Sequence, residues 1–229
     1  FPADRDFVVE SRHLGLVTAD EITDIKKRLE KLALAAEKYI RIDRICELAE
    51  SSEMSFTPLA FAKKHNARVA LSKDEAFCFF YPENVQLFEE MGAEVIPFSP
   101  LRDKKLPENI DGIILCGGYP ELYADTISEN TAMLRSVKDA VESGVPCIGE
   151  CGGFMYLHDE FEDMNGVAHK GVGVIHGRAF RTPRLKNFGY SIITAERDNL
   201  LCKKGESFPV HEFHYFDSTC CGDDFTAVK

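Results

Sequence analysis

The chain has 229 residues, of which 45% are hydrophobic and 28% are charged, and its formal net charge is −11. This is the composition of a globular protein, and no apolar stretch approaches the ~20 residues of a membrane-spanning helix, so we expect neither disorder nor a membrane span. An acidic chain is poorly suited to the phosphate backbone of a nucleic acid, so we expect no nucleic-acid partner.

The eight cysteines do not have the spacing of a disulfide framework. Cysteines such as Cys78, Cys116 and Cys147 lie singly in apolar runs, which is typical of free thiols in a reducing compartment, and we expect a cytoplasmic protein. The chain has no CxxC motif. Neither Cys220-Cys221 nor the HxxH pair of His211 and His214 fits a zinc template, so we expect no metal site.

Two helices are predicted in the N-terminal part. Residues 18–21, TADE, have the form of a capping box, and apolar residues follow at three-and-four spacing as far as Ala36, which predicts a long amphipathic helix. A second, shorter helix is predicted over residues 41–51. The polar, Ser-rich stretch that follows is typical of a linker, and we place the linker at residues 56–66.

From residue 67 onward, short β-rich runs alternate with helical ones. This alternation indicates βαβ units and a mostly parallel sheet, with catalytic groups at the C-terminal ends of its strands. The predicted strands are 68–72, 77–80, 93–98, 110–116 and 145–149, and the predicted helices are 82–92 and 119–144.

Beyond Gly166 the pattern changes to glycine-punctuated runs at 171–182, 187–196 and 210–217. These runs predict strands of an antiparallel extension. The chain shows no internal repeat. It also lacks a GxxxxGK[ST] loop, so the sequence offers no recognisable cradle for nucleotide phosphates.

Cys151 lies in the frame Gly-Glu-Cys-Gly-Gly, between a predicted strand and a predicted helix. A nucleophile between small residues at such a junction is the nucleophile-elbow arrangement. The helix N-terminus would favour the thiolate and lower the pKa, and the Gly152 N–H would stabilise an oxyanion. The alternative is a buried thiol beside Cys147, the usual state of a free cysteine, but the flanking glycines favour a nucleophile.

A cysteine nucleophile needs a base, and the histidines are the candidates. In a strand over 210–217, alternation puts His211 on one face and both Glu212 and His214 on the other, so only one histidine can face the cysteine. Either could equally be a surface or core residue. The other histidines that compete on spacing grounds are His158, His169 and His176.

A third feature is LCGGYPELY, in which a buried strand ends in Gly117-Gly118. Paired glycines allow backbone N–H groups to approach a ligand closely, as an oxyanion hole or substrate cradle requires. The alternative is a tight strand-to-helix turn with Pro120 at the helix start. Because the predicted Cys151 turn lies one strand away, an oxyanion hole or substrate cradle at Gly117-Gly118 is favoured over a simple turn.

Three motifs together, CGGYPELYADTISEN, GECGGFMYL and HEFHYF, resemble the glutaminase domain of the cobyrinic acid a,c-diamide synthase family. These are class I glutamine amidotransferases of the cobyric acid synthase subgroup. The resemblance also runs through SRHLGLVTADE, DEAFCFFYPENVQLFEEMGAEVIPFSPLRDKKLP and FGY, and it therefore covers nearly the whole chain.

The resemblance implies an α/β fold, a flavodoxin-like sheet with flanking helices over residues 67–229. Residues 1–55 would be the helical end of an ATP-dependent synthetase domain, and 56–66 the linker. In that family the synthetase domain activates carboxylates a and c of a corrin precursor as acyl phosphates, and the glutaminase domain supplies ammonia from glutamine. ATP and Mg²⁺ would then belong to the synthetase domain, and we expect no cofactor in this chain.

Several alternatives stay open. The acceptor could be another acidic tetrapyrrole of the sirohydrochlorin type rather than cobyrinic acid. The chain could instead be a degenerate docking module, or a thiol hydrolase or peptidase that acts without a synthetase. A homodimer is one expectation for its assembly.

By the resemblance, Cys151 matches the family nucleophile, which forms a γ-glutamyl thioester, and His214 matches the general base and acid. Gly118 and Gly152 match the positions whose N–H groups face the oxyanion.

The chain departs from the class I pattern at one position. The carboxylate that these enzymes carry two residues after the histidine is replaced by Phe216. This leaves either a Cys–His dyad or another orienting group, for which Glu212 and Asp217 are the candidates.

Overall fold

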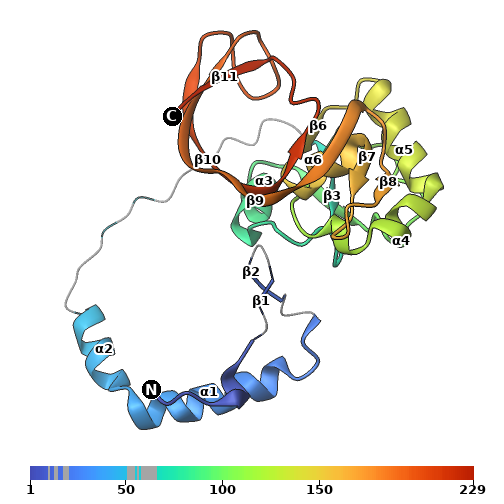
Figure 1. The fold of residues 1–229 in the computed structure, drawn as a ribbon. Coiled ribbons are helices and arrows are strands. Elements are labelled where there is room, and N and C mark those ends of the chain that lie inside the picture. The colour runs from blue at the N-terminus through green and yellow to red at the C-terminus, as the bar shows by residue number, and fades with distance from the viewer. Residues whose placement is uncertain (10, 13–14, 18–20, 51–54, 56, 58–65) are drawn as a thin grey trace. The chain divides into compact units, whose positions relative to one another are not determined.

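The computed structural model of the chain describes residues 1–9, 11–12, 15–17, 21–50, 55, 57 and 66–229 (Figure 1). The contacts divide the chain into two units, Phe1–Ala60 and Phe61–Lys229. Among the described residues, no helix is both long enough and apolar enough to cross a membrane.

The first unit contains the two predicted helices, α1 (Ile25–Tyr39) and α2 (Ile42–Glu50). They follow a short 3-10 helix, η1 (Arg5–Phe7), and the antiparallel pair β1 (Ser11–Arg12) and β2 (Gly15–Leu16). Residues 18–20 of the predicted capping box lie outside the described residues. So do nearly all residues of the predicted linker, so the proposed domain boundary stays a prediction.

The second unit is built on a parallel sheet of four strands, β3 (Arg68–Ser72), β4 (Glu94–Phe98), β5 (Gly112–Leu115) and β6 (Cys147–Gly149). Their order is β4-β3-β5-β6, and all three pairings are parallel, which confirms the predicted α/β sheet. The C-terminal ends of β5 and β6 therefore lie side by side, and these ends lead into Gly117 and Cys151.

The predicted strand at 77–80 is wrong. That segment contains only an isolated bridge between Phe79 and Gly117. The reason is a turn directly after β3, in which the Asp74 carboxylate accepts the N–H groups of Ala76 and Phe77 and bends the chain away from the sheet. The predicted helix that follows is present as α3 (Pro82–Glu90), with Pro82 in its first turn.

The single helix predicted over 119–144 is also wrong, because the segment is divided into η3 (Pro120–Leu122), α4 (Ala124–Glu129) and α5 (Thr131–Glu142). The break between α4 and α5 falls at Asn130. Its buried side-chain amide donates hydrogen bonds to the carbonyl oxygens of Pro100 and Asp103, at 2.9 and 2.8 Å. These tertiary contacts hold Asn130 in a non-helical conformation (φ −80°, ψ 56°).

Helix α6 (Gly152–Leu157) leads from β6 into a second sheet of β7 (His158–Glu162), β8 (Ala168–Lys170), β9 (Ile175–Ala195), β10 (Ser207–Ser218) and β11 (Phe225–Val228). The order is β10-β9-β7-β8, and β11 also pairs with β9. The predicted antiparallel character holds for β9 and β10, which form a long curved ribbon in Figure 1, but β7 pairs with β9 in parallel.

The core of this unit joins the two sheets. Leu115 on β5, Val137 on α5 and Phe161 on β7 are fully buried. The ring of Tyr156 on α6 packs edge-on against that of Phe77, with centroids 5.3 Å apart. Burying each such side chain contributes on the order of 2 kcal/mol, so α6 is held firmly between the sheets.

Candidate functional site

Cys151 lies on a strained turn between β6 and α6. Its backbone has φ 51° and ψ −109°, a conformation that residues with a side chain rarely adopt. The glycines beside it permit a close approach to β5, because a Cβ on Gly153 would lie 2.1 Å from the carbonyl oxygen of Leu115. The predicted strand-turn-helix arrangement around Cys151 is confirmed, and the strain is of the kind found at functional sites.

Two backbone N–H groups face the sulfur of Cys151, those of Gly152 and Gly118. Gly118 has φ 156°, and a Cβ there would lie 2.2 Å from the carbonyl oxygen of Ala76. A Cβ on Gly152 would lie 3.2 Å from the nitrogen of Gly118, so the two N–H groups are neighbours. The structure thus brings together three of the predicted site residues, in the arrangement of an oxyanion hole.

The pKa of the Cys151 thiol is raised above its ordinary value, contrary to the expectation from the helix dipole. Desolvation is the main cause, and the negative charges of Glu121 and Glu150 add to it. The N–H groups of Gly152 and Gly118 act in the expected direction and lower the pKa, but they do not outweigh these effects. The resting cysteine is therefore a neutral thiol at pH 7 and needs a base.

Cys151 differs from its neighbour Cys147 in accessibility. Cys151 is exposed as a residue although desolvation raises the pKa of its thiol, whereas Cys147 is half-buried and burial raises the pKa of its thiol to about 11. All eight cysteines lie in the described part of the chain and all are free. The interpretation of Cys151 as one more buried thiol is therefore not supported.

His214 is a half-buried residue of β10, and its tautomer follows from its contacts. Its Nδ1 atom lies 2.5 Å from the carbonyl oxygen of Phe216. A carbonyl oxygen can only accept, so Nδ1 carries the hydrogen, and the neutral ring keeps a lone pair on Nε2. The pairing of β10 with β9 shifts register on both sides of His214. This irregularity lets the backbone carbonyl of Phe216, two residues further along the strand, reach the His214 ring.

Neither predicted orienting carboxylate is hydrogen-bonded to this ring. Asp217 is ion-paired with Lys186, and that hydrogen bond is the main reason why the pKa of Asp217 is lowered. For the Glu212 carboxylate the structure records no hydrogen bond with any described residue. The partner of Nδ1 is instead the backbone carbonyl of Phe216, the residue that stands where class I enzymes have a carboxylate.

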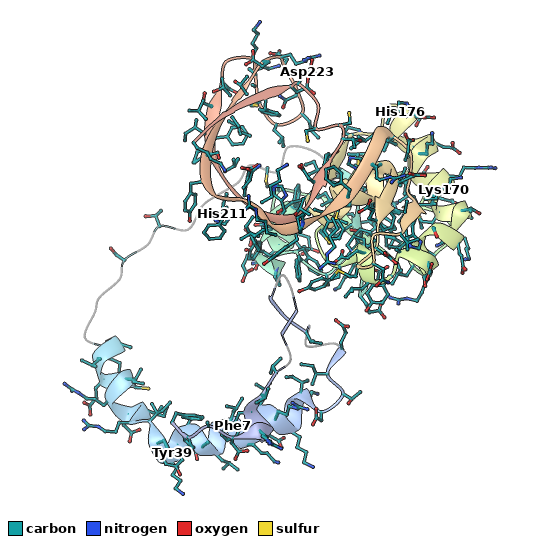
Figure 2. The ribbon with its side chains drawn as sticks, in the orientation of Figure 1. Phe7, Tyr39, Lys170, His176, His211 and Asp223 are labelled. Atoms are coloured by element: carbon teal, nitrogen blue, oxygen red, sulfur yellow. The ribbon has the colours of Figure 1, made fainter. Side chains whose placement is uncertain are left out.

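The competing histidines are placed differently. Both ring nitrogens of the buried His158 are engaged, with the carbonyl oxygen of Phe154 at 2.8 Å and the hydroxyl of Ser218 at 2.6 Å. His211 is exposed on the outside of the β9–β10 ribbon (Figure 2), where its ring packs against that of Tyr190, as alternation predicts. The remaining two described histidines face carboxylates: His169 those of Asp125 and Asp163, and His176 that of Asp159.

His214 is thus the base candidate, although it shares no hydrogen bond with Cys151. Proton transfer between the two side chains would require a bridging water or a shift of β10. Within the described ranges, no group of three or more His, Cys, Asp or Glu side chains is placed to hold a metal ion.

Sequence reasoning missed the roles of two residues, one near Cys151 and one beside His214. Glu121 is 3% exposed and acts on the Cys151 thiol through its charge. The other is Phe216, whose backbone carbonyl oxygen accepts a hydrogen bond from the His214 ring. Because every residue has such a carbonyl, nothing in the sequence could point to it. For Glu121 a signal existed, since a carboxylate directly after Gly-Gly-Tyr-Pro lies at the edge where catalytic groups collect.

The fold and the site define an α/β protein that presents a cysteine on a strained strand-to-helix turn, beside two backbone N–H groups. Residues 68–224 match the CobB/CobQ-like glutamine amidotransferase domain, and the chain belongs to this family. The family confirms the resemblance found in the sequence.

The chain is similar to several proteins named cobyrinate a,c-diamide synthase. It is 40% identical over 215 residues to that of Caldanaerobacter subterraneus, which covers 93% of this chain and 48% of that protein. It is 40% identical over 213 residues to that of Clostridium acetobutylicum, covering 93% of this chain and 47% of that protein. The chain thus spans about half the length of the curated relatives it matches.

Among solved structures, PurLQS from Thermotoga maritima has a similar fold. The TM-score is 0.50 at 17% identity, and the match covers 72% of this chain and 76% of that one. This likeness supports the α/β fold alone.

Proposed function

We propose that this chain hydrolyses glutamine and delivers the ammonia to an ATP-dependent synthetase part, which amidates the a and c carboxylates of cobyrinic acid. The observation that carries the proposal is the strained Cys151 turn, with the N–H groups of Gly118 and Gly152 facing its sulfur. The identity of 40% to cobyrinate a,c-diamide synthases over 93% of the chain supports the choice of acceptor.

In the first half of the reaction, Nε2 of His214 takes the proton from the Cys151 thiol, through a bridging water or after a shift of β10, and the sulfur attacks the carboxamide carbon of glutamine. The carbonyl oxygen becomes an oxyanion and accepts the N–H groups of Gly118 and Gly152. When the tetrahedral intermediate collapses, the carbon–nitrogen bond breaks, and the leaving nitrogen takes the proton from His214 and departs as ammonia. The product on the enzyme is a γ-glutamyl thioester.

In the second half, a water molecule attacks the thioester carbon while His214 takes one of its protons. The same two N–H groups stabilise the second oxyanion. Its collapse breaks the carbon–sulfur bond, the proton returns to Cys151, and glutamate leaves. Because the resting thiol has a raised pKa, both halves depend on His214 rather than on a preformed thiolate.

ATP and Mg²⁺ would bind the synthetase part, and no step on this chain passes through them. The synthetase would activate each carboxylate as an acyl phosphate, which ammonia then attacks, with phosphate as the leaving group.

The glutaminase step is tested by incubating the chain with 6-diazo-5-oxo-norleucine, a glutamine analogue that alkylates such nucleophiles. A single adduct on Cys151, prevented by excess glutamine, is the expected result, together with loss of glutamate release in Cys151→Ala. An adduct on another cysteine, or glutamine hydrolysis that survives in Cys151→Ala, would overturn the proposal.

The acceptor is tested with a chimera in which this chain replaces the matching half of the Caldanaerobacter enzyme. We expect it to amidate cobyrinic acid with either glutamine or ammonium as the nitrogen source, and the Cys151→Ala chimera to keep only the ammonium reaction. Failure with glutamine in a chimera that still uses ammonium would count against ammonia delivery by this chain.

A further inference from the structure

The carboxylate of Asp74 accepts four hydrogen bonds in the turn after β3. Its Oδ1 accepts the N–H groups of Ala76 and Phe77, at 3.0 and 3.1 Å. Its Oδ2 accepts the hydroxyl of Ser99 at 2.8 Å and the N–H of Leu101 at 3.0 Å. Asp74 is only 8% exposed, and a buried carboxylate is tolerated because donors surround it in this way.

These bonds join two segments that are far apart in the sequence. Ala76 and Phe77 belong to the turn at the C-terminal end of β3, whereas Ser99 and Leu101 follow the C-terminal end of β4. The carboxylate therefore fixes the turn after β3 from two sides, at the edge of the parallel sheet where the cysteine lies.

This turn packs against the loop that carries Gly118. The carbonyl oxygen of Ala76 accepts the N–H of Tyr119 at 2.9 Å, and the N–H of Phe79 donates to the carbonyl oxygen of Gly117 at 3.0 Å. Gly118 itself packs against the same carbonyl of Ala76, so closely that no Cβ fits between them. The position of the Gly118 N–H thus depends on where Ala76 lies.

We propose that Asp74 is a positioning residue of the glutaminase reaction, which acts through Ala76 to aim the Gly118 N–H at the oxyanion. The inference rests on the proposed function. An oxyanion donor works only within a narrow distance of the developing charge, and a shift of well under 1 Å reduces its contribution. Asp74 never touches glutamine, so its removal should reduce turnover and leave substrate binding largely intact.

The test compares Asp74→Ala with Asp163→Ala in the chain. The Asp163 carboxylate likewise accepts two backbone N–H groups, those of Asn165 and Val167, but in the turn between β7 and β8. Three quantities are measured on each folded variant. They are kcat and KM for glutamine, the Kd for glutamate γ-semialdehyde, and the limiting rate at high pH at which iodoacetamide alkylates the Cys151 thiolate, a rate that does not depend on the pKa of the thiol.

The three quantities separate positioning from folding. The aldehyde forms a hemithioacetal whose oxygen occupies the oxyanion hole, whereas alkylation displaces iodide and builds no charge on a carbonyl oxygen. For Asp74→Ala we expect kcat to fall by ~10-fold or more, since losing a whole oxyanion donor costs ~100-fold or more. Aldehyde affinity should fall in parallel, while KM and the alkylation rate stay within ~2-fold. Asp163→Ala should change none of them.

Asp74→Ser is the second variant, because a serine hydroxyl can accept the N–H groups of the adjacent turn but cannot reach the segment after β4. It should recover part of the lost kcat and aldehyde affinity. If Asp74→Ala does not fold, Asp74→Ser should still show a loss of ~3-fold or more in both quantities.

The inference is overturned if folded Asp74→Ala keeps wild-type kcat, or if kcat and alkylation fall together. It is also overturned if Asp74→Ala unfolds while Asp74→Ser behaves as wild type. A wild-type chain that neither hydrolyses glutamine nor binds the aldehyde would instead contradict the proposed function itself.

Discussion

The Nδ1 atom of His214 lies 2.5 Å from the carbonyl oxygen of Phe216. Class I enzymes carry a carboxylate at the position of Phe216, and here the backbone carbonyl of Phe216 takes over its orienting role. The carbonyl holds the ring in the tautomer that leaves Nε2 able to accept a proton. It does not bring a full negative charge to stabilise the imidazolium. Among the described residues, the group hydrogen-bonded to Nδ1 is thus a backbone carbonyl, and the Asp217 carboxylate interacts with the ring through its charge alone.

From this relationship we predict that neither candidate carboxylate is essential. Glu212→Gln and Asp217→Asn should each keep kcat for glutamine within ~3-fold of wild type, whereas His214→Ala should lose ~100-fold or more. Because the Lys186–Asp217 pair is partly exposed, its loss should also change the free energy of unfolding by less than ~1 kcal/mol. Steady-state kinetics and urea unfolding provide the measurements. A 100-fold loss in Glu212→Gln would show that this carboxylate does orient the histidine.

Gly118 should tolerate no side chain. In Gly118→Ala the new Cβ meets the Ala76 carbonyl at 2.2 Å, and the backbone has φ 156°, so the loop must move and take the N–H with it. We expect a loss of ~100-fold in kcat and a destabilisation of ~2 kcal/mol or more.

The matched control is Gly166→Ala. This glycine also has positive φ, 78°, but a Cβ there meets open space. It should lose only ~1 kcal/mol of stability, with kcat unchanged. Equal losses of kcat in the two variants would show that the effect at Gly118 comes from general strain rather than from the oxyanion site.

The alkylation of Cys151 by iodoacetamide should depend on pH with a midpoint above the ordinary thiol value of 9.0, because its pKa is raised. At lower pH the neutral thiol dominates, so the rate should fall steadily from pH 9 to pH 7. Peptide mass spectrometry separates this site from the other cysteines. A plateau already reached at pH 7 would mean that the thiolate is preformed.

Glu121→Gln should shift that midpoint downward, because the charge of Glu121 is one cause of the raised pKa. Glu129→Gln is the control, since it removes an equal charge from the end of α4. An unchanged midpoint in Glu121→Gln would show that desolvation alone holds the thiol neutral.

Tyr156→Phe should make the chain more stable, by ~1 kcal/mol. The Tyr156 hydroxyl is fully buried and has no hydrogen-bond partner among the described residues, so its removal relieves an unpaired polar group and keeps the ring packed against Phe77. Phe161→Ala, which removes a buried ring outright, should lose ~3 kcal/mol or more. Denaturant unfolding of both variants checks the pair, and a destabilised Tyr156→Phe would reveal a partner for the hydroxyl.

The strands and helices that the sequence predicted correctly are those whose pattern is local. Hydrophobic runs and terminal signals such as Pro82 marked β3, α3, β4 and β6 within a few residues. Two of the errors, the strand at 77–80 and the single helix over 119–144, arose where a side chain binds a distant part of the chain. Asn130 breaks a continuous helical pattern because its side chain contacts the segment after β4. Asp74 also binds that segment, and it bends the chain before the apolar run 77–80, which has the pattern of a strand.

The sequence by itself determined the α/β class, the family and the cysteine turn, because glycine spacing and hydrophobic alternation are properties of neighbouring residues. The tertiary structure alone decided the pKa of that cysteine and the tautomer of His214. A pKa depends on desolvation and on charges such as Glu121, which folding brings near the sulfur. The tautomer depends on a carbonyl oxygen, which every residue possesses and only the folded backbone can place against a ring nitrogen.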